Sequence, residues 1–200
     1  MEIILATRNK KKVEEIKRIF TGLSITVLSL DNYPDCPETV EDRDTFEGNA
    51  LKKAVEVCQC TGKPALADDS GLEVDALNNA PGVYSARYAG GSGGGNDVKN
   101  YEKVLAELKN VPDERRGARF VCCMALAFPD GTTKTFFGYS EGRIGLEPKG
   151  NTGFGYDPVF IPQGFEKAFA EMTGNEKDRL SHRGKAIEKT VEYLHSQLHL

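Results

Sequence analysis

The sequence predicts an α/β protein with one long, mixed central sheet flanked by helices and divided into two lobes. Short apolar segments of strand length alternate with segments whose apolar residues recur at helical spacing, which is typical of helices that cover a sheet. Pro129-Asp130-Gly131 separates two apolar runs and indicates a hairpin. No internal repeat or linker divides the 200 residues, so we expect one domain over residues 1–200.

The first expected elements are a strand, a helix and a second strand. Residues 2–6 are a short apolar run of strand length. Val13, Ile16 and Phe20 then recur at i, i+3 and i+7, which places them on one face of a helix. Residues 24–30 are again of strand type, so the second strand is expected there.

A second helix and a third strand follow. Thr45 is a suitable N-cap for a helix that continues to about Cys60. The third strand is expected within residues 63–74, with an interruption at the ADDSG stretch, residues 67–71.

The second half of the chain begins with a turn-rich loop. Its glycine run, residues 90–95, predicts mobility. A helix is expected at residues 97–108, and the hairpin strands are expected at residues 119–128 and 132–138. The last helix begins near Ser181.

The overall charge argues against two classes of partner. The formal net charge is -4, which disfavours binding to bulk nucleic acid or to an anionic membrane, so any basic site is local. No segment approaches the roughly 20 apolar residues of a membrane span, and the N-terminal segment lacks the apolar core of a signal peptide. We therefore expect a cytoplasmic protein that binds neither nucleic acid nor membrane.

The five cysteines are expected to be reduced and mostly buried thiols. Cys58 and Cys60 lie two residues apart, and Cys122 and Cys123 are adjacent. Neither spacing resembles the paired C-x2-C units of a zinc site.

Four cationic residues gather where the first helix begins. Helix N-termini carry a partial positive charge, so anions are their usual neighbours. One interpretation is a solvated run of lysines balanced by the acidic residues that follow. The other is a phosphate site, where Thr7 and Asn9 lie at a turn whose free N–H groups bind the anion. The four cations are Arg8, Lys10, Lys11 and Lys12.

Asp68 and Asp69 end an apolar strand and form a second candidate site. Two adjacent carboxylates repel each other unless a cation or a proton lies between them. Mg²⁺ prefers one or two protein carboxylates together with substrate phosphates and water. The pair is therefore a candidate metal site, whereas Glu41, which precedes a helix, is by itself more typical of a cap.

Two motifs near the C-terminus complete the candidates. Phe154 and Tyr156 lie between glycines, which is typical either of a tight turn with core aromatic residues or of a pocket for a planar ring. Lys177, His182 and Arg183 again place cations around the start of a helix. Two such gatherings indicate a shared anionic ligand.

Six motifs fall in order across almost the whole chain. They are T-x-N-x-x-K at residues 7–12, E-x(3)-T-F-x(2)-N-A-x(2)-K-A at 41–54, ADDSGL at 67–72, PGVYSARY at 81–88, GFGYDPVF at 153–160 and LSHRGKA at 180–186. Together they resemble the Ham1/RdgB family of inosine triphosphate pyrophosphatases, also called XTP/dITP diphosphatases. The resemblance implies an ITPase/Maf-like fold with the active site in the cleft between two lobes, and a homodimer. The glycine run at 90–95 and Gly174-Asn175 depart from the family pattern.

The resemblance also implies roles for individual residues. The general base corresponds to Asp69, with Asp68 beside it, and the metal ligands correspond to Glu41 and Asp69. The expected substrate-binding residues are Thr7, Arg8, Asn9, Lys10, Lys11, Lys12, Lys53, Ser70, Phe154, Gly155, Tyr156, Asp157, Lys177, His182 and Arg183.

The resemblance implies a hydrolase that uses one or more Mg²⁺ ions per subunit and converts dITP, ITP and XTP to monophosphate and pyrophosphate. Asp69 or Asp68 would activate a water for attack on the α-phosphorus. Two alternatives remain open: a Maf-like nucleotide pyrophosphatase of other base specificity, and a non-catalytic module that senses a nucleotide. The acidic pair favours an enzyme, because a pure binder does not need carboxylates near phosphates.

Overall fold

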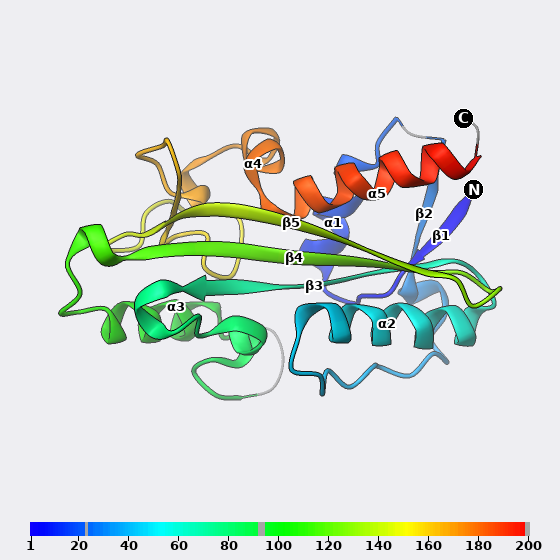
Figure 1. The fold of residues 1–200 in the computed structure, drawn as a ribbon, viewed down its shortest axis with the longest axis horizontal. Coiled ribbons are helices and arrows are strands. Elements are labelled where there is room, and N and C mark those ends of the chain that lie inside the picture. Colours follow the sequence, from blue (N-terminus) through cyan, green and yellow to red (C-terminus); the bar gives the residue numbers. More distant parts are fainter. Residues whose placement is uncertain (23, 92–94, 199–200) are drawn as a thin grey trace. The chain divides into compact units, whose positions relative to one another are not determined.

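The computed structural model describes residues 1–22, 24–91 and 95–198. Within these residues a six-stranded sheet has the order β2-β1-β3-β4-β5-β6 (Figure 1). Strand β1 is parallel to both β2 and β3, whereas β5 and β6 are antiparallel. The sheet is therefore mixed, as predicted. Its strands are β1 (Glu2–Leu5), β2 (Thr26–Ser29), β3 (Ala65–Val74), β4 (Gly117–Ala127), β5 (Thr133–Ile144) and β6 (Phe160–Pro162).

Helices join these strands at most of the predicted places. Thr45 caps α2 by accepting a hydrogen bond from the Gly48 N–H, and Gly62 ends that helix in the left-handed conformation. No helix in the described part of the chain is both long and apolar enough to cross a membrane. The helices are α1 (Lys10–Ile19), α2 (Phe46–Thr61), α3 (Asp97–Glu107), α4 (Gly174–Leu180) and α5 (His182–Leu198).

The chain divides into two compact units. Unit 1 comprises Met1–Asp69, Cys122–Gly138 and Arg183–Leu200, and unit 2 comprises Ser70–Val121 and Tyr139–His182. The chain therefore passes from unit 1 to unit 2 at the Asp69–Ser70 bond and returns at the His182–Arg183 bond. The expectation of an active site in a cleft between two lobes stays a prediction.

In unit 1, the alternation of side chains along the strands separates two packing surfaces. Ile3 and Leu5 of β1 pack in one core cluster with Leu66 and Met124, and helices α1 and α5 contribute Ile16 and Ile187 to it. Figure 1 shows α2 on the side of the strands opposite α5.

In unit 1, the strand residues whose side chains point to the other face of the sheet include several small residues. Ala65, Ala67 and Ala125 are buried, as are Ala50 and Ala54 of α2. Small side chains allow a helix to approach a sheet closely, so α2 lies near β3, the strand that carries the acidic pair.

Unit 2 has an aromatic core. The rings of Phe120, Phe160 and Phe169 pack against one another with centroids 4.6 to 6.1 Å apart. Val104 and Leu108 belong to the same cluster, which is how α3 is attached to the strands of this unit.

Three predicted features differ in the structure. Strand β3 continues through the ADDSG stretch without interruption, because ion pairs made by the two aspartates offset the low strand propensity of this stretch. Strand β5 extends to Ile144, six residues past its predicted end, where it pairs with the unpredicted β6. Residues 92–94 of the glycine run, for which mobility was predicted, lie outside the described residues.

The prediction that all cysteines are reduced was wrong. Cys36 and Cys60 form a disulfide, with their Cα atoms 5.9 Å apart. They are 24 residues apart in sequence, and only the fold of this region brings them together, so no local spacing marked them. The remaining cysteines, Cys58, Cys122 and Cys123, are free and buried as predicted.

Arg116 is buried and joins three backbone segments of unit 2. Its guanidinium donates hydrogen bonds to the carbonyl oxygens of Leu108 (2.8 Å), Ile144 (3.0 Å) and Gly145 (2.8 Å). The first of these carbonyls ends α3 and the other two lie where β5 ends. Arg116 therefore joins the end of α3 to the end of β5 through hydrogen bonds, in addition to the apolar contacts that α3 makes with the sheet.

We expect Arg116→Met to lower the free energy of unfolding by about 3 kcal/mol, because buried carbonyls that lose their donor cost about 1–3 kcal/mol each. Urea unfolding followed by circular dichroism measures the change. Arg115→Met is the matched control, since Arg115 is exposed and should change stability by less than about 0.5 kcal/mol. Equal unfolding midpoints for the two variants would contradict this assignment.

Candidate active site

The turn before α1 is organised by short polar side chains. The Thr7 hydroxyl accepts a hydrogen bond from the Asn9 N–H (3.2 Å). The Asn9 side-chain oxygen accepts hydrogen bonds from the N–H groups of Lys11 (3.1 Å) and Lys12 (3.3 Å). The sequence predicts free N–H groups at this turn. In the structure, the N–H groups of Lys11 and Lys12 are instead capped by the Asn9 side chain. A bound phosphate would have to share them or contact the surrounding side chains.

The four cations at this turn have different environments. Lys10 and Lys11 are exposed. Arg8 donates a hydrogen bond to the Cys36 carbonyl (2.9 Å) and lies 3.8 Å from the Asp31 carboxylate. Lys12 forms an ion pair with the first residue of the acidic pair, its ammonium lying 3.0 Å from the Asp68 carboxylate. The cationic run is thus neither fully solvated nor wholly directed to one site.

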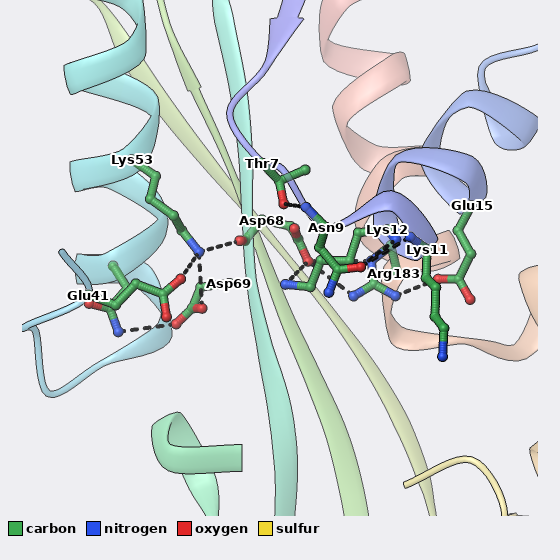
Figure 2. A network of polar contacts seen from close by, with 11 residues as sticks. Thr7, Asn9, Lys11, Lys12, Glu15, Glu41, Lys53, Asp68, Asp69 and Arg183 are labelled. Atoms are coloured by element: carbon green, nitrogen blue, oxygen red, sulfur yellow. Dashed lines mark hydrogen bonds and ion pairs between the residues drawn. The ribbon is translucent and has the colours of Figure 1, made fainter. Parts of the chain in front are cut away.

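Asp68 is completely buried between two cations. Its carboxylate lies 3.0 Å from the Lys12 ammonium and 3.1 Å from the Arg183 guanidinium (Figure 2). Burial alone would raise the pKa of Asp68, but Lys12 and Arg183 outweigh it and hold the pKa well below its usual range. Asp68 is therefore ionised and fixed in position.

Arg183 binds a second carboxylate as well. Its guanidinium donates to Glu15 of α1 at 2.6 Å, and only 2% of its side chain is exposed. Burial lowers the pKa of Arg183, yet Asp68 and Glu15 raise it above its ordinary value. Arg183 thereby links α5 to α1 and β3. The prediction that it also recognises the base stays a prediction.

Lys53 of α2 lies among the other acidic groups. Its ammonium is 2.6 Å from Glu41, 3.2 Å from Asp69 and 2.7 Å from the Asp68 carbonyl oxygen. Burial lowers the pKa of Lys53, but the surrounding carboxylates outweigh burial and raise it to about 12. Figure 2 shows Glu41 and Asp69 directed to this one cation.

Asp69 differs from Asp68 in its partners. It accepts a hydrogen bond from the Asn49 side chain (3.2 Å) and contacts Lys53, and 9% of its side chain is exposed. Burial raises the pKa of Asp69 above its ordinary value, and the cations Lys53 and Lys12 only partly oppose this. The two adjacent aspartates thus differ in accessibility and in electrostatic environment.

The donor set fits a hard divalent cation. No group of three or more His, Cys, Asp or Glu side chains suited to a metal occurs in the described ranges. Glu41 and Asp69 nevertheless direct their oxygens at a single cation, the Lys53 ammonium. Two carboxylates suffice for Mg²⁺ when phosphate oxygens and water supply the remaining ligands. The residues present are therefore compatible with the expected metal.

The second group of predicted residues lies in unit 2 and centres on Asp157. This buried carboxylate binds the Lys177 ammonium (2.6 Å) and accepts a hydrogen bond from the Phe154 N–H (2.8 Å). The Lys177 ammonium lies 5.0 Å from the centre of the Phe154 ring. A capping box between Thr173 and Glu176 starts the helix that presents Lys177.

Three further predicted residues, Tyr156, His182 and Ser70, are buried or partly buried in unit 2. Tyr156 belongs to the core, and its hydroxyl donates to the Ser85 carbonyl (2.7 Å). His182 is buried and stacks on Phe120 with ring centroids 4.6 Å apart. Ser70 is partly buried at the end of the Asp68-Asp69 pair.

The structure thus forms two groups of predicted residues, one in each unit. Three members of these groups were not predicted: Glu15, which binds Arg183, Asn49, which binds Asp69, and Asp97, whose carboxylate accepts a hydrogen bond from the Gly155 N–H (2.9 Å). Asn49 is polar on an apolar helix face, beside Ala50, and this was a usable signal. Glu15 and Asp97 looked like ordinary acidic residues of helices, and nothing local marked their partners.

Comparison with known proteins shows the family of the chain. A model of the Ham1 family matches residues 3–193. The chain is 49% identical over 192 residues to a dITP/XTP pyrophosphatase of Geobacter sulfurreducens, covering 96% of each protein. The structure of a HAM1 protein from Coxiella burnetii is similar, with a TM-score of 0.88, 39% identity, and coverage of 98% of this chain and 99% of that one.

A second solved structure is also similar. It is a nucleoside-triphosphatase, named as a dITP/XTP pyrophosphatase, from Mycobacterium abscessus. Its TM-score is 0.77 at 45% identity, with coverage of 95% of this chain and 98% of that one.

We expect Arg183→Met to lower the free energy of unfolding by about 3–5 kcal/mol, because it leaves the buried Asp68 and Glu15 without their shared cation. Thermal and urea unfolding measure the change. Arg143→Met is the control, since Arg143 pairs at 3.2 Å with Glu166, whose side chain is 93% exposed, and should cost no more than about 1 kcal/mol. Comparable losses in both variants would show that burial of the pair is not decisive.

Proposed function

The chain belongs to the Ham1 family, and from this premise we propose that it is a dITP/XTP pyrophosphatase. It hydrolyses non-standard purine nucleoside triphosphates, namely dITP, ITP and XTP, to the monophosphate and pyrophosphate. This activity removes such nucleotides from the pool available for nucleic-acid synthesis.

One observation supports this proposal most directly. In unit 1, adjacent carboxylates at Asp68 and Asp69 are surrounded by the cations Lys12, Lys53 and Arg183. A site that only binds a polyanion has no need for carboxylates, since they repel it. Carboxylates interleaved with cations suit phosphoryl chemistry, in which both a divalent ion and the phosphate oxygens must be held.

The cations near α1 hold the triphosphate in this proposal. Thr7 and Asn9 supply short polar groups at the turn, and Lys12 supplies charge where Asp68 already fixes its position. Arg8, Lys10 and Lys11 add positive charge at the same helix start. Positioning and charge stabilisation are most of what such a reaction requires.

Asp69 accepts a proton from the attacking water. It has some exposure to solvent and a single cationic contact, whereas Asp68 is fully buried between two cations. The water oxygen attacks the α-phosphorus, the bond between that phosphorus and the bridging oxygen breaks, and pyrophosphate leaves with the bonding electrons. The products are a nucleoside monophosphate and pyrophosphate.

Glu41 and Asp69 are the residues that would hold Mg²⁺. When bound, the ion neutralises charge on the phosphate oxygens and favours departure of pyrophosphate. Lys53 neutralises the same two carboxylates in the structure, and so keeps them close together.

The purine base is recognised by the group of residues in unit 2. Phe154 stacks on the ring, and Asp157 holds the Lys177 ammonium beside it. Hypoxanthine and xanthine carry an oxygen acceptor at C6, where adenine carries an amino donor. A donor placed to bind this oxygen, such as His182 or a backbone N–H group, would face the amino group of adenine instead, which disfavours ATP. Guanine also carries the C6 oxygen, so rejection of GTP requires that the site lack either space or an acceptor for the 2-amino group.

The two alternatives have no supporting observation of their own. A Maf-like specificity is disfavoured because the match to the Ham1 family spans residues 3–193. A non-catalytic sensor is disfavoured by the acidic pair. Homodimerisation and a cytoplasmic location stay predictions, and sedimentation at micromolar concentration tests the first.

The central test is pyrophosphate release from a panel of nucleoside triphosphates, with and without Mg²⁺. We expect dITP, ITP and XTP to have kcat/KM values at least about a hundredfold above those of ATP and GTP, because unpaired buried donors cost about 1–3 kcal/mol each. Ribose and deoxyribose forms should be similar, and chelation of Mg²⁺ should abolish turnover. Equal values for ITP and ATP would refute the proposed specificity.

Asp69→Asn removes both the base and a metal ligand while preserving the size of the side chain. We expect turnover to fall by about a thousandfold or more, since general base catalysis alone contributes about 10²–10⁴-fold. Binding of ITP, measured by calorimetry, should persist because a negative charge near a polyanion is lost. Asp35→Asn, at an exposed position, is the control. Normal turnover by Asp69→Asn would exclude both roles.

Lys12→Ala should weaken hydrolysis of every triphosphate alike, because a phosphate contact is independent of the base. A charge-assisted contact is worth about 1.5–3 kcal/mol, so kcat/KM should fall by about ten- to a hundredfold. Lys17→Ala, on the exposed last turn of the same helix, should have little effect. A changed ratio of ITP to ATP hydrolysis in Lys12→Ala would place Lys12 elsewhere.

A further inference from the structure

The turn at residues 153–157 is held by an aspartate that the proposed reaction does not use. The Asp97 carboxylate, in the first turn of α3, accepts a hydrogen bond from the Gly155 N–H at 2.9 Å. Gly155 is 58 residues away in sequence, so this contact exists only in the folded chain. Gly155 directly follows Phe154, so the contact restrains the segment that carries the Phe154 ring.

This turn needs restraint from outside because it contains two glycines in the left-handed region. Gly153 has φ 74° and Gly155 has φ 63°, and glycine visits many other conformations at little cost. The bond from the Phe154 N–H to Asp157 closes the turn internally. The oxygen of the next peptide group, the Phe154 carbonyl, accepts a longer internal bond from the Asp157 N–H (3.3 Å). Because peptide groups are planar, a bond at the Gly155 N–H also fixes the Phe154 carbonyl and restricts the backbone that carries the ring.

Asp97 belongs to a helix, α3, that is hydrogen-bonded to neighbouring backbone segments of unit 2; we call α3 and these segments the frame. Asn100, one turn further along α3, is buried and accepts a hydrogen bond from the Ala89 N–H (2.8 Å) while donating to the Ala86 carbonyl (3.1 Å). This joins α3 to the segment that follows Ser85. The Ser85 carbonyl in turn accepts the Tyr156 hydroxyl (2.7 Å).

Ser85 also connects this frame to β3. Its hydroxyl accepts a hydrogen bond from the Leu72 N–H (2.9 Å) and donates to the Gly82 carbonyl (2.6 Å). Gly155 and Tyr156 of the turn are therefore both hydrogen-bonded to one connected set of backbone segments. Asp157 is held separately, by Lys177 and by the Ala170 N–H (3.2 Å).

We infer that Asp97 is a positioning residue for base discrimination: its bond to the Gly155 N–H sets the orientation of the Phe154–Asp157 turn and thereby of the groups that recognise the base. The inference rests on the proposed function, because it concerns the base site of that reaction. Asp97 has no part in phosphate binding or proton transfer, so its loss changes selectivity and KM more than kcat.

Three substitutions separate this role from the effect of a negative charge at a helix start. Asp97→Asn keeps an acceptor of the same length but loses the charge that favours the α3 N-terminus. Asp97→Glu keeps the charge but moves the carboxylate by one methylene. Asp97→Ala loses both. Asp113→Ala is the control, an exposed aspartate that starts a short helical turn elsewhere in unit 2.

The readout is the ratio of kcat/KM for ITP to that for ATP. We expect this ratio to fall about tenfold in Asp97→Ala and Asp97→Glu, a change of about 1.4 kcal/mol. In Asp97→Asn and Asp113→Ala it should stay within about threefold of the unsubstituted protein, and kcat for ITP should change little in all four. Urea midpoints should follow charge instead, with Asp97→Glu retained and Asp97→Asn slightly lowered.

Hydrogen exchange of residues 153–157, followed by mass spectrometry, provides a readout independent of activity. Exchange should be faster in Asp97→Ala and Asp97→Glu than in Asp97→Asn. An unchanged substrate ratio in Asp97→Ala, or a ratio that follows the urea midpoints across the three variants, would overturn the inference.

The same measurements distinguish failure of this inference from failure of the proposed function. An unsubstituted protein that hydrolyses ITP and ATP equally well refutes the function. In that case the positioning role of Asp97 is tested by hydrogen exchange alone, and an unchanged exchange rate of residues 153–157 in Asp97→Ala overturns it. If Asp97→Ala does not fold, Asp97→Glu, which retains the helix charge, supplies the same comparison.

Discussion

The burial of the Asp68 carboxylate between Lys12 and Arg183 is the interaction on which unit 1 depends. An isolated ion in the protein interior costs several kcal/mol in lost hydration, so this carboxylate is tolerated only because two cations contact it. Those cations come from α1 and α5, while Asp68 belongs to β3. The requirement for charge balance therefore fixes two helices against the strand. It also places Asp69, the next residue, beside Lys53 on α2.

The same interaction accounts for one cation at each of two helix starts. Lys12 and Arg183 both lie in the first turn of their helices, where the helix dipole disfavours positive charge. A single buried anion compensates both. Asp68 thus performs structurally what a bound phosphate would perform at an ordinary helix N-terminus. A triphosphate that approaches these helices meets cations already held in place, and little ordering entropy remains to be lost on binding.

Unit 2 achieves order by a different means. Its Asp157–Lys177 pair is buried and compact, but the adjoining turn contains glycines and is restrained chiefly through backbone hydrogen bonds. Charge neutralisation prevails in unit 1, and backbone restraint prevails around the turn of unit 2. The two requirements of the proposed reaction correspond to this division, because phosphate chemistry needs fixed charge and base recognition needs fixed shape.

The sequence by itself determined the alternation of strands and helices, the cap at Thr45 and the hairpin turn, and it supplied the candidate site residues, which stay predictions. These follow from local periodicity, from capping chemistry and from motifs whose residues are close in sequence. It did not determine the continuity of β3 through ADDSG, the Cys36–Cys60 disulfide, or the contacts of Glu15 with Arg183 and of Asp97 with Gly155. Each of these joins residues distant in sequence, or depends on such contacts. Whether a carboxylate is a solvated surface group or a buried partner is decided by which cation or N–H group the fold brings to it, and only the tertiary structure supplies that.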